Sequence, residues 1–320
     1  MSAAEVWPIV KILVLGGTGY VGRKLIPCLL EEGHQVRCLA RDPGKLISND
    51  VEAMGGDAID EAAMDLAVNG CDSIVYLIHT MGNHSANFEE LDSRIASNVS
   101  AAANRHQVKQ IVYLGGLGNR QLDQTPHLRS RHKVARVLQK SGVPVTELRA
   151  AVIIGSGSAS FEMIKALVNR LPIMICPKWV NVRTQPIAIE DALAYIMRSL
   201  EMRPLQSQSI DIGGPTILSY REMMLVVAKQ MQLRRTIIPV PVLTPWLSSH
   251  WVNLVTRVAA PLARALIESV RSETVCENDI ALRMFDVKPL GFEEAVSKAL
   301  SRKDPASSEL PISGNGGKVI

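Results

Sequence analysis

The residues best suited to chemistry are the glycines that follow an early apolar segment. Residues 10–25 read VKILVLGGTGYVGRKL, in which Gly17, Gly19 and Gly22 fit the pattern G-x-G-x-x-G, and Gly16, Gly19 and Gly22 fit the related G-x-x-G-x-x-G. Glycines at this spacing permit a tight strand-to-helix turn and let backbone N–H groups approach a pyrophosphate at the positive end of a helix. A glycine-rich turn without a ligand is the alternative, but the flanking strand and helix patterns favour a dinucleotide site. The expected contact residues are Gly16, Gly17, Thr18, Gly19, Tyr20, Val21 and Gly22.

The end of the next strand pattern indicates which dinucleotide binds. In NAD sites, an Asp or Glu about 20 positions past the glycines bonds the ribose hydroxyls. Here that position holds Arg41, followed by Asp42. A guanidinium is suited to bidentate contact with the 2′-phosphate of NADP, and Arg37 is a candidate to assist it. The position therefore favours NADP. NAD is the alternative, in which Asp42 binds the ribose and Arg41 is a solvated charge.

A second acidic residue is a candidate for the adenine end of the cofactor. Asp57 follows Gly55 and Gly56, where we expect the third strand. Its carboxylate is placed to contact the edge of the adenine. A turn or helix-capping aspartate is an equally good interpretation of the same residue.

The elements that must position these residues alternate between strand and helix patterns. Expected strands lie at 10–15, 35–40, 56–59, 73–78, 110–114 and 145–148, and expected helices at 20–32, 43–54, 61–68, 88–106 and 127–140. Near-continuous apolar strands joined by helices predict an α/β fold, a doubly wound Rossmann-type parallel sheet covered on both faces.

Beyond Gly155 the rhythm changes. Helices at 161–171, 191–200 and 220–231 and a strand at 209–212 predict a small C-terminal lobe. We expect one domain over residues 8–300, with the lobe starting near residue 156. A disordered tail is expected over 301–320, which is rich in Ser, Gly, Pro and charge.

Composition narrows the range of partners and locations. The 320 residues are 47% hydrophobic and 21% charged, as in soluble globular proteins. The net charge of +4 is too small and dispersed to favour nucleic acid as a partner. The five cysteines form no C-x-x-C pair, so we expect free thiols in a reducing compartment and no metal site. The N-terminal segment lacks the pattern of a secretory signal, and a cytoplasmic location is expected.

One apolar helical pattern raises the question of membrane contact. It covers residues 241–267 and contains Trp246 and Trp251. An interfacial helix on a membrane surface is one interpretation, and a packed lobe helix or dimer contact is the other. The absence of a lysine-rich polar face favours the packed helix. The oligomeric state is left open.

These motifs together resemble the atypical short-chain dehydrogenase/reductase superfamily, and within it the NmrA-like NAD(P)-binding branch. The resemblance is carried by Gly16–Gly22, Arg41, Gly56-Asp57 and Leu148-Arg149, which leads into Gly155. It continues through TQPIAIED at 184–191 and through the segment at 212–220. The resemblance implies a bound dinucleotide. Its branch contains both oxidoreductases and proteins that bind NADP without turnover.

The catalytic residues implied by this resemblance are only partly present. The superfamily places a Ser after the fifth strand and a Y-x-x-x-K pattern on the next helix, where Tyr exchanges the substrate proton and Lys holds the ribose. Here Gly115-Gly116 stands at the Ser position, Arg129 at the Tyr position, and Lys133 is retained. Arg129 cannot act as a general acid at neutral pH. Lys133 is expected to contact the ribose, with a solvated charge on a basic helix as the alternative.

A missing Tyr requires another proton donor if the protein is an enzyme. His79, His127 and His132 are candidates because imidazole titrates near neutrality. His79 follows the central strand, and ligands of open α/β sheets lie beyond the carboxyl ends of strands. We therefore expect His79 and Lys133 as catalytic residues, although a loop histidine without a catalytic role would look the same.

Two functions follow from the sequence. The first is an NADP(H)-dependent oxidoreductase acting on a small organic substrate with a non-standard acid/base group. The second is a non-catalytic NADP(H) sensor, regulator or assembly factor. Sugar-nucleotide epimerisation is weaker than either, because that chemistry also relies on the missing Tyr.

Overall fold

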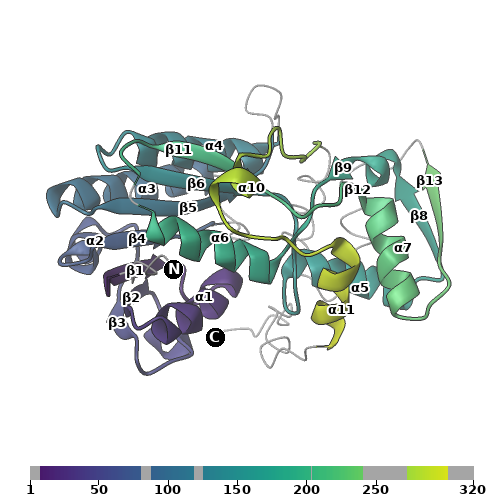
Figure 1. Cartoon of the computed structure of the whole chain (residues 1–320), viewed down its shortest axis with the longest axis horizontal. Coiled ribbons are helices and arrows are strands. Elements are labelled where there is room, and N and C mark those ends of the chain that lie inside the picture. Colours follow the sequence, from purple (N-terminus) through teal and green to yellow (C-terminus); the bar gives the residue numbers. More distant parts are fainter. Residues whose placement is uncertain (1–7, 81–87, 119–124, 203, 241–271, 302–320) are drawn as a thin grey trace, which may run out of the picture.

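The centre of the protein is a seven-stranded sheet whose strands all run parallel. The computed structural model describes residues 8–80, 88–118, 125–202, 204–240 and 272–301. The strand order is β11-β6-β5-β4-β1-β2-β3 (Figure 1). The strands are β1 (Lys11–Leu15), β2 (Gln35–Ala40), β3 (Glu52–Gly55), β4 (Ser73–Tyr76), β5 (Gln110–Gly116), β6 (Val145–Ala150) and β11 (Gln208–Ile212). The chain thus starts in the middle, builds outward to β3, and then returns to extend the other side from β4. The expected doubly wound Rossmann-type sheet is confirmed.

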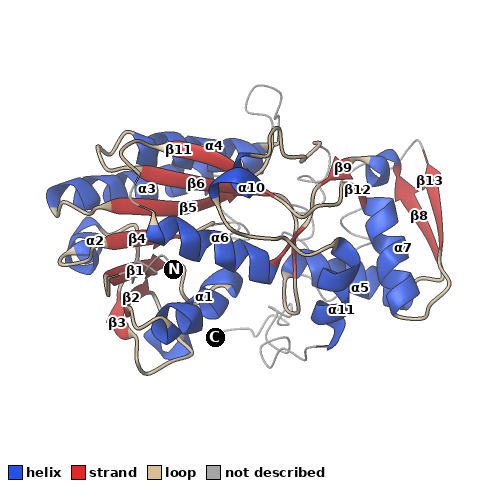
Figure 2. Cartoon of the chain, in the orientation of Figure 1, coloured by secondary structure: helices blue, strands red, loops and turns tan. Residues whose placement is uncertain are grey.

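Helices cover both faces of this sheet, as Figure 2 shows. On one face lie α1 (Tyr20–Glu31), α6 (Ile189–Glu201) and the short α10 (Ile280–Met284); on the other lie α2 (Glu61–Val68), α3 (Phe88–Arg105) and α4 (Pro126–Gln139). Alternate residues of β1 belong to the two cores: Ile12 and Val14 pack with α1 and α6, whereas Leu13 and Leu15 pack with α2 and α3. A strand buried on both faces reads as a continuous apolar run, which is why these strands were predictable.

A third apolar core lies in the C-terminal lobe. It packs α5 (Ala159–Arg170), α7 (Tyr220–Gln230) and α11 (Phe292–Ser301) against β8 (Ile173–Pro177) and β13 (Thr236–Val240), which pair in parallel. Short elements complete the lobe: β7 (Ile153–Ile154) with β10 (Ile187–Ala188), β9 (Arg183–Thr184) with β12 (Leu218–Ser219), and the 3-10 helix η2 (Lys178–Asn181). The domain boundaries expected from the sequence stay a prediction. The apolar pattern at 241–267 lies outside the described residues, as does the tail apart from Ser301.

None of the helices in the described part of the chain combines the length and the apolar character that a membrane crossing requires. The expectation of a cytoplasmic location therefore stays a prediction.

One segment differs from the sequence-based expectation. A helix over 43–54 followed by a strand at 56–59 was wrong: the structure has the 3-10 helix η1 (Pro43–Lys45) and the strand β3 at Glu52–Gly55. This strand lies at the sheet edge, and its four residues are exposed or partly exposed, so it has no apolar pattern. Its backbone pairs with β2, and Glu52 adds ion pairs to Lys11 of β1 at 2.6 Å and to Arg37 of β2 at 2.7 Å.

The docking of α10 on the sheet is open to a direct test. Phe285, which is 4% exposed, packs edge-to-face on Tyr195 of α6 with ring centroids 5.4 Å apart. We expect Phe285→Ala to lower the free energy of unfolding by about 3–5 kcal/mol, because it leaves a cavity in the core. The neighbouring Met284→Ala is the control, with an expected loss of about 0.5 kcal/mol, since Met284 is 40% exposed. Urea unfolding measures both, and equal losses would contradict this packing.

Candidate functional site

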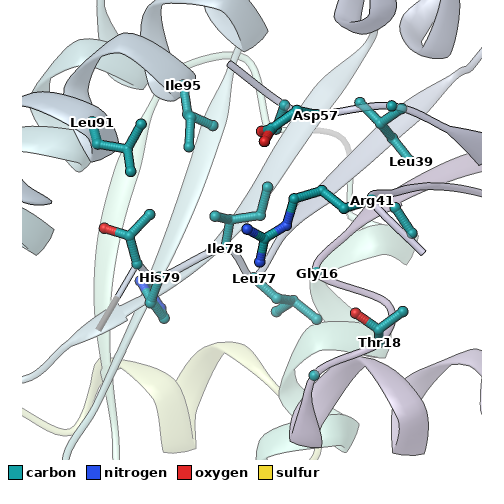
Figure 3. A pocket seen from close by; sticks show the side chains of 15 residues that line it. Gly16, Thr18, Leu39, Arg41, Asp57, Leu77, Ile78, His79, Leu91 and Ile95 are labelled. Carbon is teal, nitrogen blue, oxygen red and sulfur yellow. The ribbon is translucent and has the colours of Figure 1, made fainter. Parts of the chain in front are cut away.

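A cleft of about 310 Å³ opens at the carboxyl ends of the strands on one half of the sheet (Figure 3). Its walls come from the segments that follow β1, β2, β3 and β4 and from one side of α3. The lining residues are Gly16, Thr18, Gly19, Leu39, Ala40, Arg41, Gly56, Asp57, Ala58, Leu77, Ile78, His79, Thr80, Leu91 and Ile95. Because β1 and β4 are neighbours but lead to opposite halves of the sheet, the cleft lies at the switch point where α/β sheets bind ligands.

The glycine turn brings α1 unusually close to the end of β1. Gly16 has φ +91°, a left-handed conformation that favours glycine, and its carbonyl accepts a bond from the Gly19 N–H at 3.0 Å. A Cβ on Gly22 would lie only 2.3 Å from the Gly16 oxygen, and one on Gly17 would lie 2.7 Å from the Cys38 sulfur. The N-cap residue Gly19 supplies no side-chain hydrogen bond. The first N–H groups of α1 are thus left for a ligand at the cleft wall.

The other two residues of the glycine segment have different neighbours. Tyr20 and Val21 begin α1 and pack against the first core, and neither lines the cleft. The Tyr20 hydroxyl lies where a Cβ on Gly155 would be, at 2.3 Å. Tyr20 therefore joins α1 to the start of the C-terminal lobe, and Val21 supports the turn from behind.

Arg41 and Asp42 separate at the end of β2. Arg41 projects into the cleft in Figure 3, whereas Asp42 pairs with Lys45 at 3.4 Å and does not line the cleft. The expected assistance from Arg37 was wrong. Its Nη1 donates to the carbonyls of Ala67 and Asn69 at 2.9 and 2.6 Å, so it caps the carboxyl end of α2 on the far side of β2.

Asp57 makes a local turn and also lies at the cleft wall. Its carboxylate lies at the cleft wall in Figure 3, and its Oδ1 accepts a bond from the Ile59 N–H at 3.2 Å. That bond makes a local turn which fixes the carboxylate next to the space beyond β3. The turn interpretation is confirmed, and contact with adenine stays a prediction.

His79 lies in the cleft wall but does not titrate near neutrality, contrary to the sequence-based expectation. Burial lowers its pKa well below the ordinary value, and the nearby Arg131 lowers it further. The Nε2 of His79 lies 3.1 Å from the Leu114 carbonyl, to which it can only donate. The ring is therefore neutral with its proton on Nε2, and Nδ1 is left as an acceptor. A neutral imidazole of this kind does not supply a proton to a substrate.

The helical phase of α4 turns His127 and Arg131 toward the sheet, instead of the expected Arg129 and Lys133. Lys133 is exposed and does not line the cleft, and Arg129 is exposed and pairs with Glu89 at 3.2 Å. His127 and Arg131, which share the same four-residue spacing, are the partly buried pair. The assignment of Lys133 to the ribose does not fit this placement, because its side chain leaves α4 toward solvent.

Three further residues do not fill the position of the missing Tyr. Burial lowers the pKa of His127 well below its ordinary value, again with a contribution from Arg131. His132 is buried and lies outside the cleft wall. Burial also raises the pKa of Tyr113, whose hydroxyl donates to the Arg131 carbonyl at 3.3 Å. Neither His127 nor Tyr113 therefore ionises near neutrality.

A buried network that the sequence did not indicate holds the loop after β4. Thr80 lines the cleft, and both its N–H and its hydroxyl donate to Asp92 Oδ1 of α3, at 3.2 and 2.8 Å. Ser130 of α4 donates to the other oxygen of Asp92 at 2.7 Å. Asp92 thus ties β4, α3 and α4 together. The only sequence signal was a polar residue on the apolar face of each helix.

Comparison with known proteins bears on the N-terminal half. Residues 16–165 match a family described as NAD(P)H-binding. The photosystem II assembly factor Ycf39 of Trieres chinensis is 24% identical over 207 residues, which are 64% of this chain and 64% of that protein. The chain therefore spans less than two thirds of the length of such curated relatives.

Solved structures extend the likeness over most of the chain. The NADPH-dependent quinone oxidoreductase QOR2 of Escherichia coli, complexed with NADPH, matches 89% of this chain and 98% of its own at a TM-score of 0.71 and 18% identity. MoeE5, in complex with UDP-glucuronic acid and NAD, matches 91% of this chain and 98% of its own at a TM-score of 0.72 and 15% identity. The NAD(P)H-binding match and the shared fold are consistent with the resemblance to the atypical short-chain dehydrogenase/reductase superfamily, and the NmrA-like branch stays a prediction.

The neutral histidines predict how stability depends on pH. Because the pKa values of His79 and His127 are lowered in the folded protein, the unfolded chain binds these protons first as the pH falls below about 6.5. The free energy of unfolding should then fall by about 1.4 kcal/mol per pH unit for each histidine. Urea unfolding between pH 7.5 and 5.5 measures the slope. His79→Gln and His127→Gln should each reduce the number of protons taken up on unfolding by about one, and so reduce the slope. An unchanged slope in both variants would contradict the assignment.

Proposed function

Residues 16–165 form an NAD(P)H-binding domain, and from this premise we propose that the protein is an NADP(H)-dependent oxidoreductase acting on a small organic substrate. The observation that carries the cofactor choice is at the end of β2. Arg41 projects into the cleft with no carboxylate partner in the described part of the chain, and Asp42 is engaged by Lys45 outside it. A free guanidinium next to the ribose position favours a 2′-phosphate, whereas NAD would need the carboxylate there.

The strand order suggests how the cofactor lies in the cleft. The adenosine half fits the segments after β2 and β3, with Arg41 at the 2′-phosphate and Asp57 at the adenine. The pyrophosphate fits the turn at Gly16, Thr18 and Gly19, where the N-terminus of α1 opens into the cleft. The nicotinamide half then extends toward β4 and β5, past His79. The neutral His79 Nδ1 suits an acceptor role there, for a ribose hydroxyl or the carboxamide N–H.

The protonation states of the residues near the proposed nicotinamide end of the cleft favour one kind of reaction. When bound, the cofactor supplies or accepts a hydride. Among the described residues, His79, His127 and Tyr113 do not release a proton near neutrality, and we propose that the proton that balances reduction comes from water. Substrates whose reduced form is stable as an oxyanion, such as quinones, fit this condition better than simple ketones. The fold shared with an NADPH-dependent quinone oxidoreductase agrees with this choice without establishing it.

A non-catalytic NADP(H)-binding assembly factor or regulator is the second candidate. Gly116 stands where the superfamily has its Ser, and neither His127 nor Arg129 replaces the acidic function of the Tyr. The relative Ycf39, named as an assembly factor, is similar over 64% of the chain. This candidate predicts the same cofactor binding without turnover.

The cofactor choice predicts a selective loss of NADPH affinity. Arg41→Ala should weaken NADPH by 10-fold or more, because the 2′-phosphate loses a charged partner, and should change NADH by less than about threefold. Lys45→Ala is the matched control, since it removes a nearby cation outside the cleft and should affect neither. Fluorescence titration of the reduced cofactors measures all three proteins. Equal losses of NADPH and NADH in Arg41→Ala would remove Arg41 from the 2′-phosphate.

Turnover separates the two candidate functions. NADPH oxidation at 340 nm should be observed with 1,4-benzoquinone or menadione, at rates above those with acetophenone or cyclohexanone. The rate should show no inflection near neutral pH from an enzyme acid, because no such group is present among the described cleft residues. Tight NADPH binding with no turnover across the panel would support the assembly factor or regulator instead.

A further inference from the structure

One partly buried cation at the end of β5 has no direct partner among the described residues. Arg131 of α4 lies where the parallel strands end, and its Nε–H is enclosed by protein atoms and finds no hydrogen-bond acceptor in the described part of the chain. Burial lowers its pKa, and the charge of Asp92 partly offsets that effect. The guanidinium makes no ion pair with any described carboxylate, in contrast to Arg129 two residues earlier, which is exposed and pairs with Glu89. Among the described residues, Arg131 therefore lacks a direct carboxylate contact.

The fold makes room for Arg131 at a specific place. A Cβ on Gly116 would lie 2.7 Å from the Arg131 Cδ and 2.9 Å from Leu128. The absence of a side chain at residue 116 therefore lets the arginine lie across the carboxyl end of β5. The sequence places glycine at the position where relatives by resemblance have a Ser, and here that exchange admits a cation.

Neighbouring carboxylates are already engaged. Asp92 is near enough to affect the pKa of Arg131, but its two oxygens accept from Thr80 and Ser130. Hydrogen bonds from these hydroxyl and backbone groups leave Asp92 no oxygen for a direct contact with Arg131. A guanidinium whose Nε–H is enclosed without an acceptor favours an anionic ligand, because the ligand would supply the contact that the described residues do not.

The neighbours of Arg131 indicate where such a ligand would lie. The rings of His79 and Tyr113 lie 6.1 Å apart, and Arg131 affects the pKa of His79, His127 and Tyr113. In the strand order, β5 follows β4 on the side away from the glycine turn. Arg131 is not one of the cleft's lining residues; it lies on the β5 side of His79, beside the end that the proposed cofactor orientation gives to the nicotinamide.

We propose that Arg131 binds an anionic oxygen, a carboxylate or an oxyanion carried on a planar ring, of the substrate at this end of the cleft. That the anion belongs to a substrate rests on the proposed function. The anion site itself is defined by Arg131, Gly116 and the engaged Asp92. In hydride transfer to a quinone, the electron pair of the nicotinamide C–H bond forms the new bond to the substrate, and the negative charge moves to its oxygen. Arg131 would hold that oxygen until water protonates it.

The test uses a planar carboxylate and its neutral analogue. The full-length protein, saturated with NADP⁺, is titrated with benzoate and with benzamide in a calorimeter. Benzoate should bind at least 10-fold more tightly than benzamide. Arg131→Met should lose at least 10-fold of the benzoate affinity and leave the NADPH affinity within about threefold, and Arg131→Lys should recover part of the loss. Arg129→Met on the exposed side of α4 is the matched control and should behave as the wild type.

The other outcomes separate a failure of the anion site from a failure of the proposed function. Equal binding of benzoate and benzamide would indicate an apolar pocket. A loss of NADPH affinity in Arg131→Met at unchanged benzoate affinity would assign Arg131 to the cofactor ribose. If Arg131→Met does not fold, Arg131→Lys with wild-type benzoate selectivity supports the site, and Arg131→Lys with none rejects it. Benzoate binding that depends on Arg131 without any turnover would keep this site while rejecting the oxidoreductase.

Discussion

The close approach of α1 to the end of β1 is the constraint on which the rest of the structure depends. Gly22 packs directly on the Gly16 carbonyl, and even one methyl group there would collide with backbone that cannot move aside. This contact sets the position of α1, and α1 in turn contributes Leu25, Ile26 and Leu29 to the first core. The same contact aims the N-terminus of α1 at the cleft. Packing of the sheet and binding at its edge therefore rest on a single turn.

The doubly wound order turns that local geometry into a site. Residues separated by up to about 60 positions, from Gly16 to His79, meet because parallel strands end on one edge of the sheet. Asp92 adds a second fixation, since its bonds to Thr80 and Ser130 hold the loop after β4 against α3 and α4. The half of the cleft near β2 thus carries an open cation in Arg41, and the half near β5 is held by a buried polar network.

The sequence predicted the elements whose burial imposes an apolar pattern, and it did not predict those that lack such a pattern. The apolar runs of β1, β4 and β5 predicted the sheet, and Arg41 and Asp57 were placed at the cleft because strand ends fix them. The edge strand β3 was missed because its residues are exposed or partly exposed, with backbone pairing and the ion pairs of Glu52 in place of apolar packing. Lys133 was chosen because it is the lysine of the Y-x-x-x-K pattern that the resemblance implies, but the same four-residue spacing also relates His127 to Arg131. Only the phase of α4 against the sheet separates the two pairs, and the polar residues on both sides of that helix hide its phase.

The partly buried Arg131 at the end of β5 bears on what the site can do. Burial, reinforced by the positive guanidinium of Arg131, disfavours protonation of His79 and His127, so neither imidazole becomes the acid that replaces a Tyr. The same field favours negative charge on whatever lies beside it. A site of this kind holds an anion well and delivers a proton poorly. If hydride transfer occurs here, its product must therefore leave as an anion or be protonated from water, and that restricts the substrate more strongly than the size of the cleft does.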